Sequence, residues 1–171
     1  FGAFLDSLSH ARPVPYLGDV ARLEWAWLNA FHARDAEPIS IEVLADLPPD
    51  ALGGVRIELH PSFTLIRSQW PVASLWNALV SGEQSNPVDM QQGEDVVIVQ
   101  PAMDVDVCAL PAGGYAFLDS LASGMVLADA SEAAVQAASG VELVTHLQGM
   151  FNIGAVISVS RPTGEKDSID V

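Results

Sequence analysis

Histidines, cysteines and paired carboxylates most often carry protein chemistry, and this sequence holds few of them in a pattern that could do so. Its four histidines are scattered, and no pair has the i,i+4 spacing with a third acidic ligand that suits a metal. They are His10, His32, His60 and His146, and each is expected to be a surface or hydrogen-bonding residue. The sequence holds no G-x-S-x-G, Walker, G-x-G-x-x-G or H-E-x-x-H motif. We therefore expect no active site and no bound metal or cofactor.

The single cysteine and the acidity of the chain restrict its surroundings and its partners. Cys108 excludes an internal disulfide, which fits a reducing compartment, and we expect a cytoplasmic protein. Lys and Arg number 7 against 22 Asp and Glu, a net charge of −15, so this segment would be repelled by DNA. A partner with a basic surface, or an enzyme whose active-site entrance is positively charged, fits this net charge better. No apolar run approaches the ~20 residues of a membrane helix.

One carboxylate occupies an unusual place in the pattern. Residues 15–35 read PYLGDVARLEWAWLNAFHARD, and at 100° per residue the apolar side chains share one arc with Glu24 in its middle. That arc consists of Leu17, Val20, Ala21, Trp27, Leu28 and Phe31. A buried carboxylate needs a cation or hydrogen-bond donors, or it is held protonated. We expect Glu24 to form a buried structural pair with Arg67, in preference to a catalytic role.

The first half of the chain is expected to be a helix-rich subdomain over residues 1–80. The periodicity and the Pro and Gly positions predict a helix over 16–33, a short helix over 40–47, a β-hairpin over 55–70 and a helix from Pro71. The polar, turn-rich run at 81–93 predicts a linker loop.

The second half, residues 94–160, has a clearer order of elements. EDVVIVQP and DVDVCALP predict two strands joined by a tight turn. Helices are expected over 111–122, 129–138 and 141–152, and AVISVS is expected to be a closing strand. The order strand, strand, helix, helix, helix, strand is that of a small winged-helix-like module. The fold class is therefore α+β, with a polar tail at 161–171.

Three blocks of the sequence resemble one protein family. They read PYLGDVARLEWAW, LHPSFTLIRSQWPVASLW and GEDVVIVQPAMDVDVCALPAGGYAFLDSLASG, in this order. Together they resemble the HvfC/BufC/MbnC-type proteins, which often carry the label of a DNA-binding domain protein. The resemblance covers residues 1 to about 159. Members of that family carry about one more helical domain before FGAFL, so we expect this chain to correspond to their C-terminal part.

The resemblance implies a non-catalytic partner of a multinuclear-iron TIM-barrel enzyme of the HvfB/BufB/MbnB type. Such a pair modifies cysteines in a small ribosomally made precursor peptide, in pathways tied to copper handling. The last third of the chain is also similar to PqqD-like peptide-recognition modules, through YAFLDSLASG. In those modules a leader peptide adds as a strand beside the sheet and packs against the third helix.

On this interpretation the docking edge is the strand over 104–109, where Asp and Val alternate and one face stays polar. The candidate residues are Asp104, Val105, Asp106 and Val107 on the strand, with Leu143, Leu147 and Met150 on the third helix as the opposite wall. Two other functions compete with peptide recognition. A DNA-binding regulator, with its DNA contacts mainly in a missing N-terminal region, fits the order of elements but not the charge. A hydrolase or metalloenzyme explains only Glu24.

Overall fold

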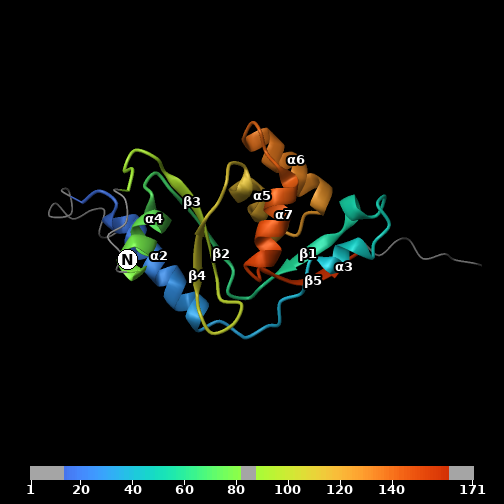
Figure 1. Cartoon of the computed structure of the whole chain (residues 1–171), viewed down its shortest axis with the longest axis horizontal. Helices are drawn as coiled ribbons and strands as arrows, with labels where there is room; N and C mark the ends of the chain where they lie inside the picture. The colour runs from blue at the N-terminus through green and yellow to red at the C-terminus, as the bar shows by residue number, and fades with distance from the viewer. Residues whose placement is uncertain (1–13, 82–87, 162–171) are drawn as a thin grey trace, which may run out of the picture.

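The computed structural model describes residues 14–81 and 88–161. In that part the chain forms an α+β fold with six α-helices and two small antiparallel sheets, which confirms the predicted class (Figure 1). The helices are α2 (Leu17–Phe31), α3 (Glu42–Ala45), α4 (Val72–Ser81), α5 (Gly114–Ala122), α6 (Leu127–Ala137) and α7 (Leu143–Asn152). The strands are β1 (Arg56–Leu59), β2 (Thr64–Ser68), β3 (Glu94–Val99), β4 (Asp106–Ala109) and β5 (Val156–Ser160). All but the first residue of the predicted polar tail, and residues 82–87 of the predicted linker loop, lie outside the described residues.

The predicted hairpin over 55–70 is wrong, because its two strands belong to different sheets. β1 pairs with β5, and β2 pairs with β3 in a three-stranded sheet of order β2-β3-β4. The connection between β1 and β2 is tied to both sheets. The backbone N–H of His60 donates to Ala155 O at 2.9 Å beside β5, and Ser62 Oγ accepts from the N–H of Gln100 at 2.7 Å beyond β3. These bonds carry the chain from one sheet to the other instead of turning it back.

The order of elements predicted for residues 94–160 is confirmed, and β3 and β4 form the expected antiparallel pair. Gly124 and Gly154 end the helices before them with φ values of 80° and 65°, a left-handed conformation that favours glycine. The closing strand β5 pairs with β1 rather than with β3 or β4. Each sheet therefore joins a strand from residues 1–80 to strands from 94–160.

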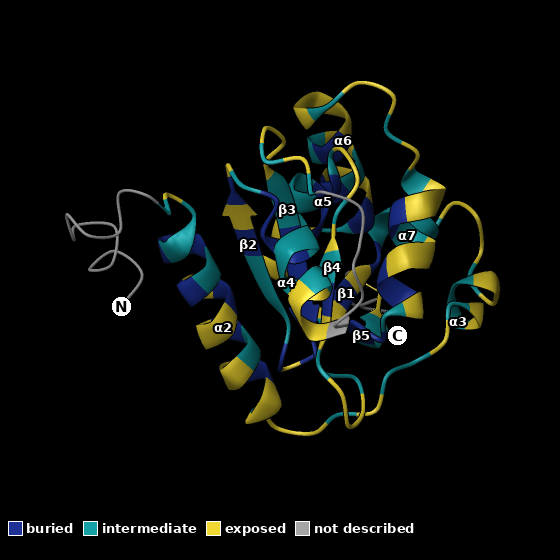
Figure 2. Ribbon diagram, turned by 60° about the vertical axis from the view of Figure 1, so that its left-hand side comes forward, coloured by how far each residue is buried: buried dark blue, intermediate teal, exposed yellow. Residues whose placement is uncertain are grey.

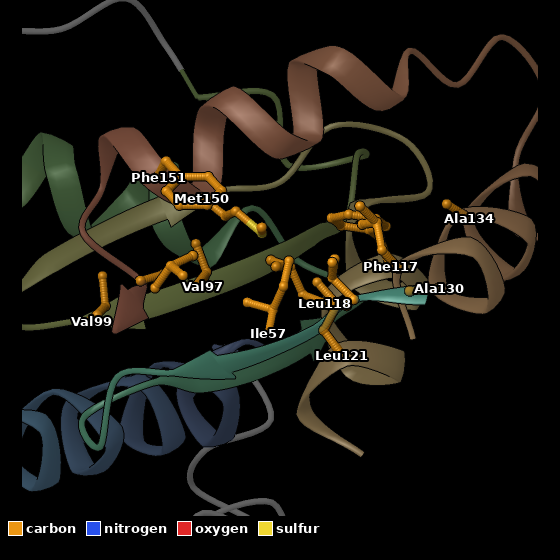
Figure 3. Close-up of a cluster of buried hydrophobic side chains, with 14 residues drawn as sticks. Ile57, Val97, Val99, Phe117, Leu118, Leu121, Ala130, Ala134, Met150 and Phe151 are labelled. Carbon is orange, nitrogen blue, oxygen red and sulfur yellow. The ribbon is translucent and has the colours of Figure 1, made fainter. Parts of the chain in front are cut away.

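The central strand β3 is buried on both faces and separates two hydrophobic cores. Val97 and Val99 point into the larger core, and Val96 and Ile98 point into the smaller one. The larger core gathers side chains from α5, α6 and α7 with β1 and β5, as Figure 3 shows for a part of it. The smaller core lies under α2 and α4, on the opposite side of the sheet.

The face that α2 buries differs from the predicted arc. Its core-facing line runs through Asp19, Leu23, Ala26 and Ala30, while Leu28 and Phe31 of the predicted arc are exposed. Figure 2 shows that α2 has buried and exposed segments along its length. The helix carries apolar residues on most of its sides, so periodicity alone does not orient it. Among the described residues, no helix is both long enough and apolar enough to cross a lipid bilayer.

Candidate functional site

Strand β4 forms an outer edge of the three-stranded sheet. In its register with β3, Cys108 lies opposite Val97, and the N–H of Leu110 donates to Asp95 O at 2.7 Å. Because alternate residues of an antiparallel strand turn their backbone groups to opposite sides, the even-numbered residues bond to β3 and Val107 and Ala109 face outward. Within the described residues no other strand pairs along this edge. The outer edge of β4 thus carries no further strand in this part of the chain, although Asn77 of α4 donates to the Val107 carbonyl oxygen there.

The side chains of β4 divide between the two faces of the sheet. Val107 is buried in the smaller core, and Val105, just before the strand begins, packs beside it. Both valines thus face α2 and α4, so their side chains do not line a groove on the α7 side. Asp104 and Asp106 are exposed. Of the predicted strand residues, Val107 offers an outward backbone edge, with Asn77 Nδ2 donating to its carbonyl oxygen at 3.4 Å.

A pocket of about 210 Å³ lies between β4 and α7, on the face opposite those valines. Cys108 and Ala109 line it from β4, and Thr145, His146, Gly149 and Met150 line it from α7. The strand and the third helix that were predicted to form the two walls of the groove thus lie on either side of this pocket. Of the three predicted wall residues Met150 lines the pocket, whereas Leu143 and Leu147 do not line it and pack against the larger core.

His146 is the pocket residue that the sequence did not single out. It is 7% exposed, and its ring stacks on Phe117 with centroids 5.7 Å apart. Its Nε2 is buried and has no hydrogen-bond partner within the described residues. The expectation of a surface or hydrogen-bonding histidine is therefore wrong here, whereas His60 is hydrogen-bonded, with Nδ1 2.7 Å from Ser62 Oγ. The i,i+4 spacing to Met150 was the available signal, since it places both residues on one helix face.

Two titratable groups near the edge, Cys108 and Asp106, have raised pKa values. Burial, and then the charge of Asp106, raise the pKa of the Cys108 thiol, which keeps it protonated and weakly nucleophilic. Burial, and then Asp104, likewise raise the pKa of the Asp106 carboxyl. Across residues 14–81 and 88–161, no three His, Cys, Asp or Glu side chains are grouped to hold a metal ion. The chemistry available at this edge is hydrogen bonding and apolar contact.

The predicted buried pair of Glu24 and Arg67 is wrong. Glu24 is exposed, on the side of α2 that faces away from the sheet. Arg67 binds Asp95, its neighbour across the β2–β3 pair, with Nε–Oδ1 and Nη2–Oδ2 distances of 2.8 and 3.1 Å. Its guanidinium also lies 4.1 Å from the ring centroid of Tyr115. The hydrogen bond to Asp95 is the largest cause of a raised Arg67 pKa.

The carboxylate that α2 does bury is Asp19, in its first turn. Its Oδ2 accepts a hydrogen bond from Ser68 Oγ at 2.6 Å, and its Oδ1 forms an ion pair with Arg22. Ser68 Oγ also accepts from the N–H of Trp70 at 3.0 Å, which ties the start of α2 to the end of β2. The buried structural carboxylate that was expected at Glu24 is thus Asp19, five residues earlier in the helix.

No protein-family model matches this chain, and a search of curated proteins found none with a similar sequence.

Proposed function

We propose that this chain is a non-catalytic peptide-recognition subunit that holds a ribosomally made precursor peptide for a separate enzyme. The observation that carries the proposal is the open edge of β4 beside α7, with a pocket between the two elements. An extended peptide would add to this edge as a fourth strand. Its backbone would bond to the outward groups of Ala109 and would replace Asn77 at the Val107 carbonyl, and one of its side chains would enter the pocket.

The two parts of this site divide affinity and specificity between them. Backbone hydrogen bonds along a sheet edge are independent of the peptide sequence and supply affinity, while side-chain pockets supply selection. The pocket walls on α7 and at Leu110, Leu118 and Ile153 are mainly apolar, which suits one well-buried peptide side chain. Asp104 and Asp106 lie exposed at the start of the edge, where they would favour a peptide that carries basic residues nearby.

The proposed enzyme partner comes from the resemblance of three sequence blocks to HvfC/BufC/MbnC-type proteins. It is an iron enzyme of the HvfB/BufB/MbnB type, which would modify cysteines of the held peptide in the cytoplasm in a copper-related pathway. The net charge of −15 supports a partner with a basic surface and opposes duplex DNA as the ligand. In this proposal the chain itself does no bond chemistry.

Substitutions at Ala109 test the strand addition directly, because its side chain is exposed and its N–H faces outward. Ala109→Pro removes the outward N–H without removing a bond to β3, and Ala109→Thr keeps that N–H as a matched control. With a leader peptide of the proposed precursor class as ligand, we expect Ala109→Pro to weaken binding about tenfold or more in titration calorimetry. The threonine variant keeps the N–H but adds bulk beside the pocket that Ala109 lines, so it should lose much less affinity than the proline variant.

Amide NMR of the wild-type chain locates the peptide in the same experiment. The proposal expects the largest shifts along β4 and α7. Equal affinity of the proline and threonine variants, or shifts confined to α2 and α4, would contradict the strand addition.

A further inference from the structure

The outer sides of α2 and α4 carry exposed apolar side chains that neither the cores nor the pocket uses, and Figure 2 shows exposed segments on both helices. We call them the α2–α4 surface. Its residues have exposed fractions between 41% and 75%, and they are Trp25, Leu28, Phe31, Leu79 and Val80. Because one aromatic side chain carries about 150–250 Å², the five together expose on the order of 500 Å². An apolar patch of this size on a soluble protein often binds a partner.

Spacing and ring contacts make the α2–α4 surface continuous. Its three residues on α2 follow one another at i,i+3 intervals, so they form one row along the helix. Phe31 of that row stacks on Trp27, and Trp27 lies 6.2 Å from Trp76 of α4. The two residues on α4 come three and four positions after Trp76, on the same side of that helix. The starts of the helices also meet, with the rings of Tyr16 and Trp70 6.3 Å apart, so the two helices run in the same general direction.

The residues around the middle of the row on α2 complement one another. Trp25 lies three residues before Leu28, and Phe31 lies three residues after it. Glu24 and His32 lie four residues before and after Leu28, and both side chains are exposed. An acceptor thus stands on one side of Leu28 and a donor at the same distance on the other side. The neighbouring α4 carries no charged residue, although the chain has a net charge of −15, so two such surfaces meet with little repulsion.

We propose that the α2–α4 surface is the interface of a homodimer, in which α2 packs antiparallel on α2 of a second copy about a twofold axis at Leu28. Contacts across a twofold axis are reciprocal, so each pairing occurs twice. This axis brings Trp25 of one copy to the level of Phe31 of the other. It also brings Glu24 to the level of His32, where an imidazole N–H can donate to the carboxylate. In a parallel pair each residue would meet itself, and Glu24 would face Glu24.

This interface goes beyond the proposed peptide recognition and is independent of it. α2 and α4 cover one face of the three-stranded sheet, and the pocket between β4 and α7 lies on the other face. A dimer through α2 would therefore leave the pocket of each copy accessible. Loss of the dimer would not contradict peptide recognition, and a failure to bind the leader peptide would not contradict the dimer.

Sedimentation velocity of the full chain over a range of concentrations tests the dimer. The α2–α4 surface is smaller than the ~800 Å² per partner of a standard stable interface, so we expect a Kd of about 10–100 μM. Unfolding measurements well below that concentration then report on the monomer. A chain that stays monomeric at every concentration would overturn the proposal, whichever other molecule covers this surface.

A lysine at the axis tests where the interface lies. Leu28→Lys places two ammonium groups opposite each other and should leave the chain monomeric throughout the same concentration range. Val135→Lys is the matched control, because Val135 is an exposed valine on α6 outside the α2–α4 surface, and its Kd should equal that of wild type. Circular dichroism checks that both variants are folded. A dimer of undiminished strength in Leu28→Lys would overturn the proposal.

A charge exchange tests the antiparallel arrangement and does not depend on Leu28→Lys folding. His32→Glu alone sets two carboxylates against each other at both pairings and should weaken the dimer about fivefold or more. Glu24→Lys alone removes the acceptor and should also weaken it. The double variant places lysine opposite glutamate and should restore the Kd to within about twofold of wild type. A structural role within one copy gives no such rescue, so a double variant no stronger than the single ones would overturn the arrangement.

Discussion

The two faces of the three-stranded sheet are built in different ways. On one face, three helices bury large side chains such as Phe117, Leu121 and Phe151 in the larger core. On the other face, α2 reaches the sheet through Leu23, Ala26 and Ala30, and large aromatic side chains lie at the rim or outside it. The exposed ones include Trp25, 63% exposed, and Phe31, 48% exposed.

This difference shows that small residues, rather than the largest apolar ones, can decide which side of a helix is buried. Alanine lets a helix approach a strand closely, so many atoms come into van der Waals contact. The aromatic rings of α2 then pack along the helix instead of under it. Trp27 stacks on Phe31 with centroids 5.6 Å apart and lies 6.2 Å from Trp76 of α4. A ranking by hydrophobicity therefore orients α5 correctly and α2 incorrectly.

The largest expected effect compares the same residue type on the two faces. Phe117→Ala should lower the free energy of unfolding by about 3–5 kcal/mol, because Phe117 is fully buried among three helices. Phe31→Ala should lower it by about 0.5–1.5 kcal/mol, mainly through the lost stacking on Trp27. Urea unfolding monitored by circular dichroism measures both values. Equal losses would mean that the two faces do not differ as described.

A smaller effect separates the two carboxylates of α2. Asp19→Ala should cost about 1–3 kcal/mol at neutral pH, because it leaves the buried Ser68 hydroxyl without its acceptor and removes the ion pair with Arg22. Glu24→Ala, on the exposed side of the same helix, should change stability by less than about 0.5 kcal/mol. Thermal unfolding of both variants at the same protein concentration checks the difference. A larger loss of stability in Glu24→Ala than in Asp19→Ala would contradict the assignment of which side of α2 is buried.

The smallest effect concerns pH and the edge strand. Burial, and then Asp104, raise the pKa of Asp106 above its ordinary value, so the folded chain binds this proton more tightly than the unfolded chain does. That contribution to stability is complete below the ordinary carboxyl pKa and is lost as the pH rises through the raised one. Asp106→Asn should therefore raise the melting temperature slightly at pH 7 relative to wild type. Melting curves across the acidic range should show this gain shrinking towards zero as the pH falls, and a gain independent of pH would contradict it.

At the candidate site, the sequence predicted the two flanking elements but not which of their side chains line the pocket. The alternating strand at 104–109 and the apolar third helix were sufficient to select two elements that do lie on either side of a pocket. The individual side chains were not predictable, because a strand pattern shows that alternate residues share a face without showing which face meets the helix. Val107 therefore points into the smaller core, and the missed residue Cys108 lines the pocket.

The sequence by itself determined the local elements, because their causes are local. Proline and glycine positions bound α5, and Gly124 and Gly154 end α5 and α7 in the left-handed conformation that only glycine adopts without strain. Short apolar runs, some of them alternating with polar residues, predicted each of the five strands. The α+β class follows from that order of elements.

Only the tertiary structure decided the pairings between distant parts of the chain. A strand edge offers the same N–H and C=O groups whatever its sequence, so nothing local distinguished β5 from β2 as the partner of β1. The register of β2 on β3 then placed Asp95, rather than Glu24, beside Arg67. For α2, apolar on most of its sides, the buried face was decided by which side could approach the sheet most closely.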